Sequence, residues 1–198
     1  MNAPAPHHDP ARTAPVELAT GKLGMRLLIA SLAVLFASTI TGYLVVRTRA
    51  EVWPPVGMPS LPSGLWLSTV LIVLSSLTIQ WAVAGIRRDR QQPLRLGLLA
   101  TLVLGLAFLA SQTVNWFGLV AADVRPGANL YAFTFFVLTW LHALHVVGGL
   151  VPLAVVTTRA WRGGYSVGFH PGVEYTAMYW HFLDVVWLIL FAVLYLGS

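Results

Sequence analysis

The stretch at residues 174–191, EYTAMYWHFLDVVWLILF, decides the fold class of this chain. It is apolar enough to cross a bilayer, yet it carries Glu174, His181 and Asp184. An acidic side chain near the bilayer centre costs about 2.5–3.5 kcal/mol on insertion scales. We therefore expect these three groups to have polar partners, and we expect the partners to indicate the function.

The composition indicates a membrane protein. Of the 198 residues, 57% are hydrophobic and 10% are charged, and the mean hydropathy is +0.74, whereas about 25% of the residues of a soluble domain are charged. The net charge is +5, but the basic residues lie in short loops between apolar runs. That pattern is typical of topology signals and not of a nucleic-acid-binding face. The chain has no cysteine, which excludes disulfides, thiolate metal sites and iron–sulfur clusters.

Five apolar runs are long enough to cross about 30 Å of hydrocarbon. They predict an all-α, polytopic transmembrane bundle of five helices, which forms a single domain over residues 23–198. The short connection RRDRQQP, residues 87–93, predicts that the second and third helices form an antiparallel hairpin. Residues 1–22 are rich in Pro and Ala and show no helical periodicity, so we expect a disordered tail there. The runs are residues 24–46, 65–86, 95–118, 129–157 and 173–196.

The basic residues are distributed unequally between the two sides of the predicted bundle. With five spans, the N-terminus shares a side with the second and fourth connections, and the positive-inside rule predicts that this more basic side is cytoplasmic and that the C-terminus lies outside. Arg87 and Arg88 are expected to help set this topology, with contacts to lipid phosphate as the weaker alternative. The cytoplasmic side carries Arg12, Lys22, Arg26, Arg87, Arg88, Arg90, Arg95, Arg159 and Arg162, against Arg47, Arg49 and Arg125 on the other side.

Small side chains recur on the third span. Gly97, Thr101 and Gly105 are four residues apart, so they lie on one face of a helix and allow another backbone to approach closely. We expect this face to pack against a neighbouring helix.

Ionisable residues recur on the fourth and fifth spans. His142 and His145 are three residues apart and lie on nearly the same face of the fourth span, while Glu174, His181 and Asp184 form a stripe on the fifth. If the two helices pack together, the histidine pair is expected to meet this stripe.

Residue chemistry leaves three interpretations of these groups open. The first is a structural network, in which the groups fix helix register by contacting one another, a lipid or a partner subunit. The second is a metal or haem site, and the third is a proton path or pore. A lone His-x-x-His lacks the paired Glu-x-x-His motifs of di-iron bundles. A relay across the membrane is disfavoured because the first three spans carry almost no ionisable residues.

Two motifs resemble the hallmarks of subunit III of the haem–copper respiratory oxidases. The first is YWHFLDVVWLILF at residues 179–191, with Glu174 a few residues earlier, and the second is FFVLTWLHALHVVGG at residues 135–149. The resemblance extends over about residues 24–196, with the segments in the family's order. Further matches are WPPVGMP at 53–59, LST at 67–69 and SSLTIQWA at 75–82.

The resemblance implies a short, five-helix, non-catalytic subunit of a proton-pumping terminal oxidase. The N-terminus, the positive-inside bias and the short form indicate a bacterial inner membrane and not a mitochondrion. The resemblance also implies direct packing on subunit I, with subunit II and a small subunit in the same complex, haem and copper in those partners and none in this chain, and structural phospholipid in the helix bundle. In this interpretation the polar and aromatic groups are structural, lipid or subunit contacts, with no catalytic residue and no metal ligand. These groups are His142, His145, Glu174, Trp180, His181 and Asp184.

Two positions depart from the family pattern. Leu32 follows Ser31 where the mitochondrial-type pattern of the family has an acidic residue, and Asn115 stands three residues after Gln112 where the family often has glutamate. The carboxylates of the family pattern therefore cannot act at these positions here. The alternatives are a subunit-III-like accessory protein of a nitric oxide reductase and a free-standing haem- or metal-binding membrane enzyme. The electron donor of an oxidase, cytochrome c or a quinol, is a property of other subunits in this family.

Overall fold

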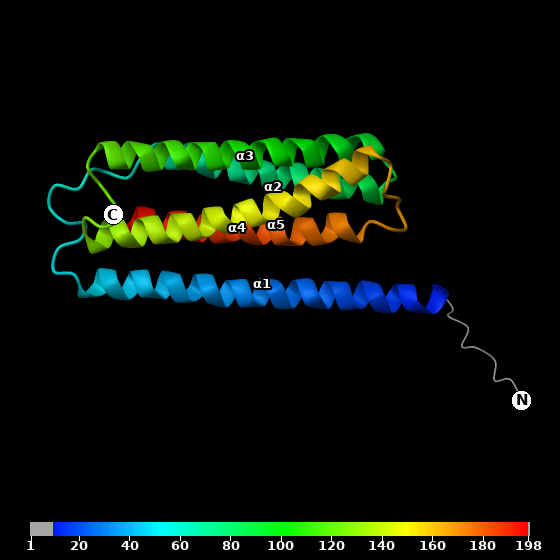
Figure 1. The fold of residues 1–198 in the computed structure, drawn as a ribbon, viewed down its shortest axis with the longest axis horizontal. Helices are drawn as coiled ribbons and strands as arrows, with labels where there is room; N and C mark the ends of the chain where they lie inside the picture. Colours follow the sequence, from blue (N-terminus) through cyan, green and yellow to red (C-terminus); the bar gives the residue numbers. More distant parts are fainter. Residues whose placement is uncertain (1–9, 198) are drawn as a thin grey trace, which may run out of the picture.

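The fold is a bundle of five α-helices (Figure 1). The computed structural model describes residues 10–197, of which residues 10–19 are described by their backbone alone. All five helices are long and apolar enough to cross a membrane, and no named strand is present among the described residues. The predicted five-helix, all-α class is therefore confirmed. The helices are α1 Pro10–Arg49, α2 Gly64–Arg87, α3 Gln91–Ala121, α4 Leu130–Trp161 and α5 Pro171–Gly197.

The first helix begins earlier than the sequence pattern indicated. In place of the disordered segment expected for residues 10–22, the structure continues α1 back to Pro10. Proline is favoured in the first turn of a helix. Extending an existing helix avoids the cost of nucleating a new one. The expectation for residues 1–9 lies outside the described residues.

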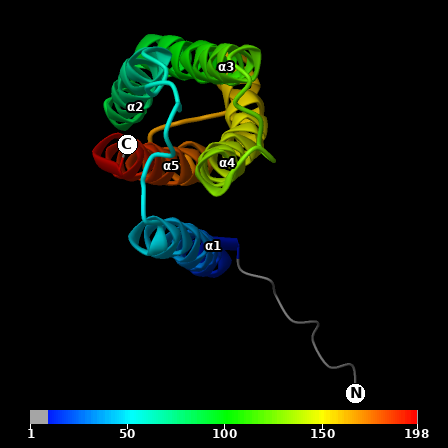
Figure 2. The same ribbon diagram turned by 90° about the vertical axis from the view of Figure 1, so that its left-hand side faces the viewer.

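Four of the helices form a ring, and α1 lies outside it. Figure 2 shows α2, α3, α4 and α5 around the ring, with α1 beside α5 and α4. The predicted α2–α3 hairpin is present and tightly packed, since a Cβ atom on Gly97 would lie 2.8 Å from the Ala82 Cβ atom. The connection turns through Asp89, whose φ is 56°.

α1 is the least buried helix of the described chain. In its most apolar window 11% of the residues are buried, against 33–50% in the windows of the other four helices. Among residues 20–49 of α1, the two buried side chains are Phe36 and Tyr43. The Phe36 ring lies 5.1 Å from the His145 ring and 6.4 Å from the Phe182 ring, between centroids. α1 is therefore attached to the ring mainly through aromatic contacts with α4 and α5.

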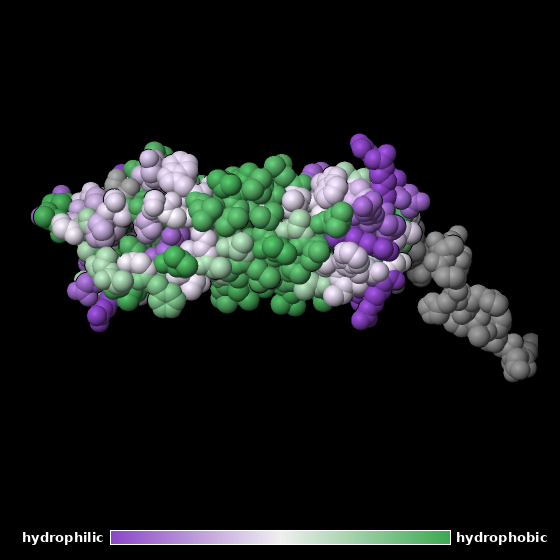
Figure 3. Space-filling model, turned by 90° about the horizontal axis from the view of Figure 1, so that it is seen from above, coloured by the Kyte–Doolittle hydropathy of each residue, from purple (hydrophilic) through white to green (hydrophobic). Residues whose placement is uncertain are grey.

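The surface is divided into zones along the helix axes. Figure 3 shows hydrophobic residues around the middle of the bundle and the strongest hydrophilic colouring near one end. That end carries the α2–α3 connection and the loop between α4 and α5. An apolar belt between polar ends is the distribution expected of a protein that crosses a bilayer.

Candidate functional site

The histidine pair of α4 lies among aromatic rings. His142 is fully buried, and its ring centroid lies 5.7 Å from that of Phe108 and 5.2 Å from that of Trp187. Neither ring nitrogen of His142 has a hydrogen-bond partner. His145 is half-buried, and its Nδ1 donates to the Leu141 carbonyl oxygen at 2.7 Å. The α4 histidines are thus enclosed by packing or bonded within their own helix.

His181 and Asp184 of α5 face α2. His181 Nδ1 lies 2.7 Å from Ser76 Oγ, and its Nε2 lies 3.2 Å from Gln80 Oε1. The Asp184 carboxyl group is buried, with Oδ2 3.9 Å from His181 Nδ1. Both partners of the histidine come from α2, a helix without ionisable residues before its last turn.

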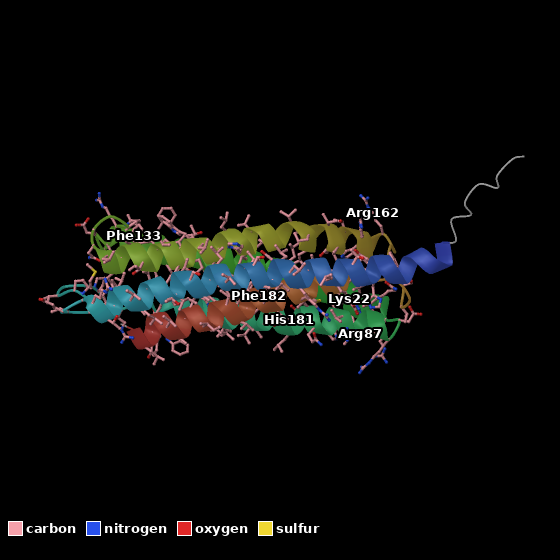
Figure 4. All side chains as sticks on the ribbon, turned by 90° about the horizontal axis from the view of Figure 1, so that it is seen from below. Lys22, Arg87, Phe133, Arg162, His181 and Phe182 are labelled. Carbon is pink, nitrogen blue, oxygen red and sulfur yellow. The ribbon has the colours of Figure 1, made fainter. Side chains whose placement is uncertain are left out.

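Glu174 lies near the beginning of α5, where three helices meet. Its Oε1 accepts from Arg87 Nη2 at 3.1 Å, and its Oε2 lies 3.4 Å from Lys22 Nζ. His170 Nε2 is 3.6 Å from the same carboxylate. Figure 4 shows Lys22 and Arg87 near one end of the bundle, with His181 further from that end. The carboxylate therefore joins α1, α2 and α5.

The histidine pair does not meet the Glu–His–Asp stripe, which corrects the expectation from the sequence. α5 directs Tyr179 and Trp187 toward α4: the Tyr179 hydroxyl donates to the His145 carbonyl oxygen at 3.1 Å, and Trp187 packs on His142. These side chains lie on one face of α5, and at 100° per residue His181 points to nearly the opposite face. Periodicity places residues on a common face but does not say which neighbour that face contacts.

Trp180 is the central buried side chain of the α2–α3–α5 contact. Its Nε1 donates to Ser75 Oγ at 2.9 Å, and a Cβ atom on Gly105 would lie 2.8 Å from its ring. Thr101 Oγ1 lies 2.8 Å from Thr78 Oγ1 on α2. The face that carries Gly97, Thr101 and Gly105 thus contacts α2 at the first two positions, and α5 and α4 at the third.

The hydroxyl groups of α2 are hydrogen-bond partners of the polar side chains of α5, and the sequence did not lead us to expect them. Ser75 and Ser76 bond Trp180 and His181, and Thr69 Oγ1 accepts from Trp187 Nε1 at 3.1 Å. The signal was present, because Thr69 and Ser76 are seven residues apart and lie on one helical face. A repeated hydroxyl face on an apolar helix indicates a partner helix with polar groups.

Two hollows lie on either side of the contact between α1 and α5. One is a polar pocket of about 310 Å³ between α1, α2 and α5, and the other is an apolar groove of about 550 Å³ between α1, α4 and α5. Among residues 20–197, no three His, Asp or Glu side chains converge as a metal site. The pocket is lined by Lys22, Arg26, Gln80, Val83, Arg87, Glu174, Ala177, Met178 and His181.

The family described as "Cytochrome c oxidase subunit III" matches residues 9–198. The chain belongs to the cytochrome c oxidase subunit III family. It is similar to the cytochrome c oxidase subunit 3 of Synechocystis, with 35% identity over 175 residues that cover 87% of this chain and 74% of the relative. The protein of the same name from Thermostichus vulcanus is 32% identical over 175 residues, 88% of this chain and 86% of the relative. The resemblance seen in the two motifs is therefore confirmed.

A third relative is longer than this subunit III chain. The cytochrome c oxidase subunit 3 of Pylaiella littoralis is 32% identical over 185 residues, which cover 88% of this chain and 65% of that relative. The matched region includes all five helices, because the family match runs from residue 9 to residue 198.

The two departures from the family pattern have different surroundings in this subunit III chain. Asn115 is buried between α3 and α2, and its Nδ2 lies 3.5 Å from Ser68 Oγ. Leu32 is half-buried on α1.

Arg88 follows the last turn of α2 and is exposed, whereas Arg87 bonds Glu174. The two expected topology residues thus have different contacts.

Proposed function

We propose that this chain is the non-catalytic subunit III of a proton-pumping haem–copper terminal oxidase, which passes electrons to oxygen in aerobic respiration. The observation that carries this proposal is the family match over residues 9–198. In this role the chain packs directly on subunit I and stabilises it. Subunit II and a small subunit belong to the same complex, and haem and copper reside in the partner subunits.

The surroundings of the histidines support a structural role for this chain. His142 is enclosed by aromatic rings, His145 is bonded to its own helix, and His181 is bonded to Ser76 and Gln80. In each case the histidine contacts come from helix packing. We infer that these groups fix the register of the helices and thereby the shape of the surface that the catalytic subunit contacts.

We also propose that the bundle binds a structural phospholipid along α1. Lys22, Arg26 and Arg87 surround one carboxylate in the polar pocket, which leaves an excess of positive charge for a phosphate group. Each basic residue near an anionic membrane surface contributes about 1 kcal/mol to lipid attraction. The apolar groove on the other side of α1, lined by Met25 and Leu28 among others, suits acyl chains.

The location follows from the same proposal. Five membrane-crossing helices make this a multi-pass membrane protein, and we place it in a bacterial inner membrane with a cytoplasmic N-terminus. The bias of basic residues toward the Arg87 end supports this orientation.

The test is purification of the chain, with a C-terminal affinity tag, from mildly solubilised native membranes. We expect a large subunit with haem and copper absorption and oxygen-reducing activity to co-purify, and untagged membranes serve as the control. Co-purification with a nitric oxide reductase instead would overturn the oxidase proposal in favour of the accessory role. A coloured protein that purifies alone would overturn the non-catalytic role.

A further inference from the structure

A histidine and a carboxyl group meet at the α2–α5 contact, at the inner edge of the polar pocket. His181 Nδ1 is 2.7 Å from Ser76 Oγ and 3.9 Å from Asp184 Oδ2, and Nε2 is 3.2 Å from Gln80 Oε1. The Asp184 side chain is 6% exposed, and neither of its oxygens has a hydrogen-bond partner. His181 is the ionisable group that the structure places beside this buried carboxyl group.

The hydrogen bonds of His181 determine which ring nitrogen carries a hydrogen. With Gln80 placed so that Oε1 faces the ring, Nε2 of His181 is the donor, because a carbonyl oxygen only accepts. In a neutral ring with this tautomer, Nδ1 accepts the hydroxyl hydrogen of Ser76. The same hydroxyl group also reaches Asp184, but its single hydrogen cannot be donated to both. A carboxylate at Asp184 would be a buried charge without a donor, and such a charge is strongly disfavoured. With a neutral His181, Asp184 therefore holds a proton.

The same proton has a second position. If it leaves the Asp184 carboxyl group and Nδ1 of His181 gains a proton, the pair becomes a carboxylate and an imidazolium, and Ser76 can accept from Nδ1 and donate toward Asp184. No electrons move, and the pair is neutral in both forms. We propose that His181 and Asp184 share one exchangeable proton and form a one-proton site inside the membrane-spanning bundle. A pair with no proton or with two protons would leave a charge without its counter-charge.

The pocket provides a route for exchange and disfavours a second proton. The His181 side chain is 36% exposed and lines the polar pocket. The charged groups of the described chain that line this pocket are Lys22 and Arg26 of α1, Arg87 of α2 and Glu174 of α5. Three positive charges against one negative charge oppose an additional proton on the ring. The proton of the pair can exchange with the pocket through the exposed His181 ring, while the proton count stays at one.

The experiment counts the protons of the pair in the full-length chain reconstituted in lipid nanodiscs. Infrared spectroscopy reports a protonated carboxyl group, and ¹⁵N NMR of labelled histidine reports an imidazolium. At about pH 8, an ordinary aspartate, with a pKa of about 3.9, and an ordinary histidine, with a pKa of about 6.5, are both deprotonated. We expect the two signals to sum to one proton per chain, and we expect Asp184→Asn to remove that proton.

The control is Glu174→Gln, which removes a carboxylate from the same pocket and should leave the count at one. His181→Gln provides a second test if Asp184→Asn does not fold, because Asp184 must then retain the proton alone. A carboxylate together with a neutral imidazole in the wild-type chain would overturn the proposal, and so would two protons. The measurement requires no oxygen reduction, so its failure is distinct from a failure of the proposed oxidase role.

Discussion

Arg87 Nη2 lies 3.1 Å from Glu174 Oε1 and ties the last turn of α2 to the first turns of α5. Lys22 extends this link to α1 through the second oxygen of the same carboxylate. One side chain thus connects three helices at the end where the proposed lipid pocket opens.

Glu174→Ala should loosen this end of the bundle. Exposed ion pairs contribute about 0–1 kcal/mol each, so we expect a loss of about 1 kcal/mol in the free energy of unfolding and a lower yield of the assembled complex. Thermal unfolding in detergent and native gels measure the two effects. Arg88→Ala is the matched control, because Arg88 is exposed beside Arg87. Equal behaviour of the two variants would show that the three-helix link is unimportant.

Gly105→Ala should destabilise the chain because its new methyl group would lie 2.8 Å from the Trp180 ring. Overpacking a filled core typically costs about 1–3 kcal/mol. Gly118→Ala on the same helix has no heavy atom within 4 Å and should stabilise the helix by up to about 1 kcal/mol. Unfolding midpoints of the two variants in detergent should therefore shift in opposite directions. A shift of Gly105→Ala in the same direction as the control contradicts the packing described for this face.

His142→Phe should retain or increase stability. The histidine ring packs among aromatic rings while both of its nitrogens lack partners, and removing unpaired polar atoms without changing shape is nearly neutral or stabilising. His142→Ala should cost roughly 2–5 kcal/mol, in the range of large-to-small core substitutions. Chemical denaturation of both variants separates packing from polar function. A phenylalanine variant as unstable as the alanine variant would indicate that the ring nitrogens have an essential partner.

Lys22→Ala combined with Arg26→Ala should reduce the amount of anionic phospholipid that co-purifies with the chain, because two of the three positive charges of the pocket are removed. Mass spectrometry of lipids extracted from the purified protein measures the loss. Arg88→Ala should retain the wild-type amount. Unchanged lipid in the double variant would exclude this pocket as the headgroup site.

Replacing Arg87 and Arg88 together by glutamate should weaken the predicted orientation, because it removes two of the basic residues on the more basic side. The chain has no cysteine, so a single cysteine at Ser198 can be labelled from one side of the membrane without background. We expect a fraction of the double variant to react from the cytoplasmic side, whereas the parent chain reacts from outside. Labelling from outside in both proteins would show that other residues set the topology.

The sequence predicted the five helices and their class because long apolar runs and basic loops are local signals. It did not predict the partners of the polar groups. His181 and Tyr179 lie on the same helix, yet His181 contacts α2 and Tyr179 contacts α4, and that difference depends on how α5 is rotated in the bundle. Ser75 and Ser76 lie in an apolar run whose pattern does not indicate their partners, yet their hydroxyl groups bond Trp180 and His181.

The position of α1 outside the ring also could not be predicted from local sequence patterns. Its apolar run is as long as the others, but the pattern does not reveal that it lies outside the ring. That arrangement depends on two aromatic residues among many: Phe36, whose ring contacts His145 on α4, and Tyr43, whose ring contacts Trp53 in the connection between α1 and α2.

The placement of α1 has a consequence for biosynthesis. It is synthesised first, yet its helix contacts are with α4 and α5, which are synthesised last. Arg47, for example, donates to the Leu196 carbonyl oxygen, 149 residues further along the chain. α1 therefore enters the membrane before its partner helices exist, and lipid surrounds it until α4 and α5 have been translated. The hydroxyl groups of α1 are satisfied without a partner helix during this time, because Ser31, Ser38 and Thr41 each donate to a carbonyl oxygen four residues earlier in α1.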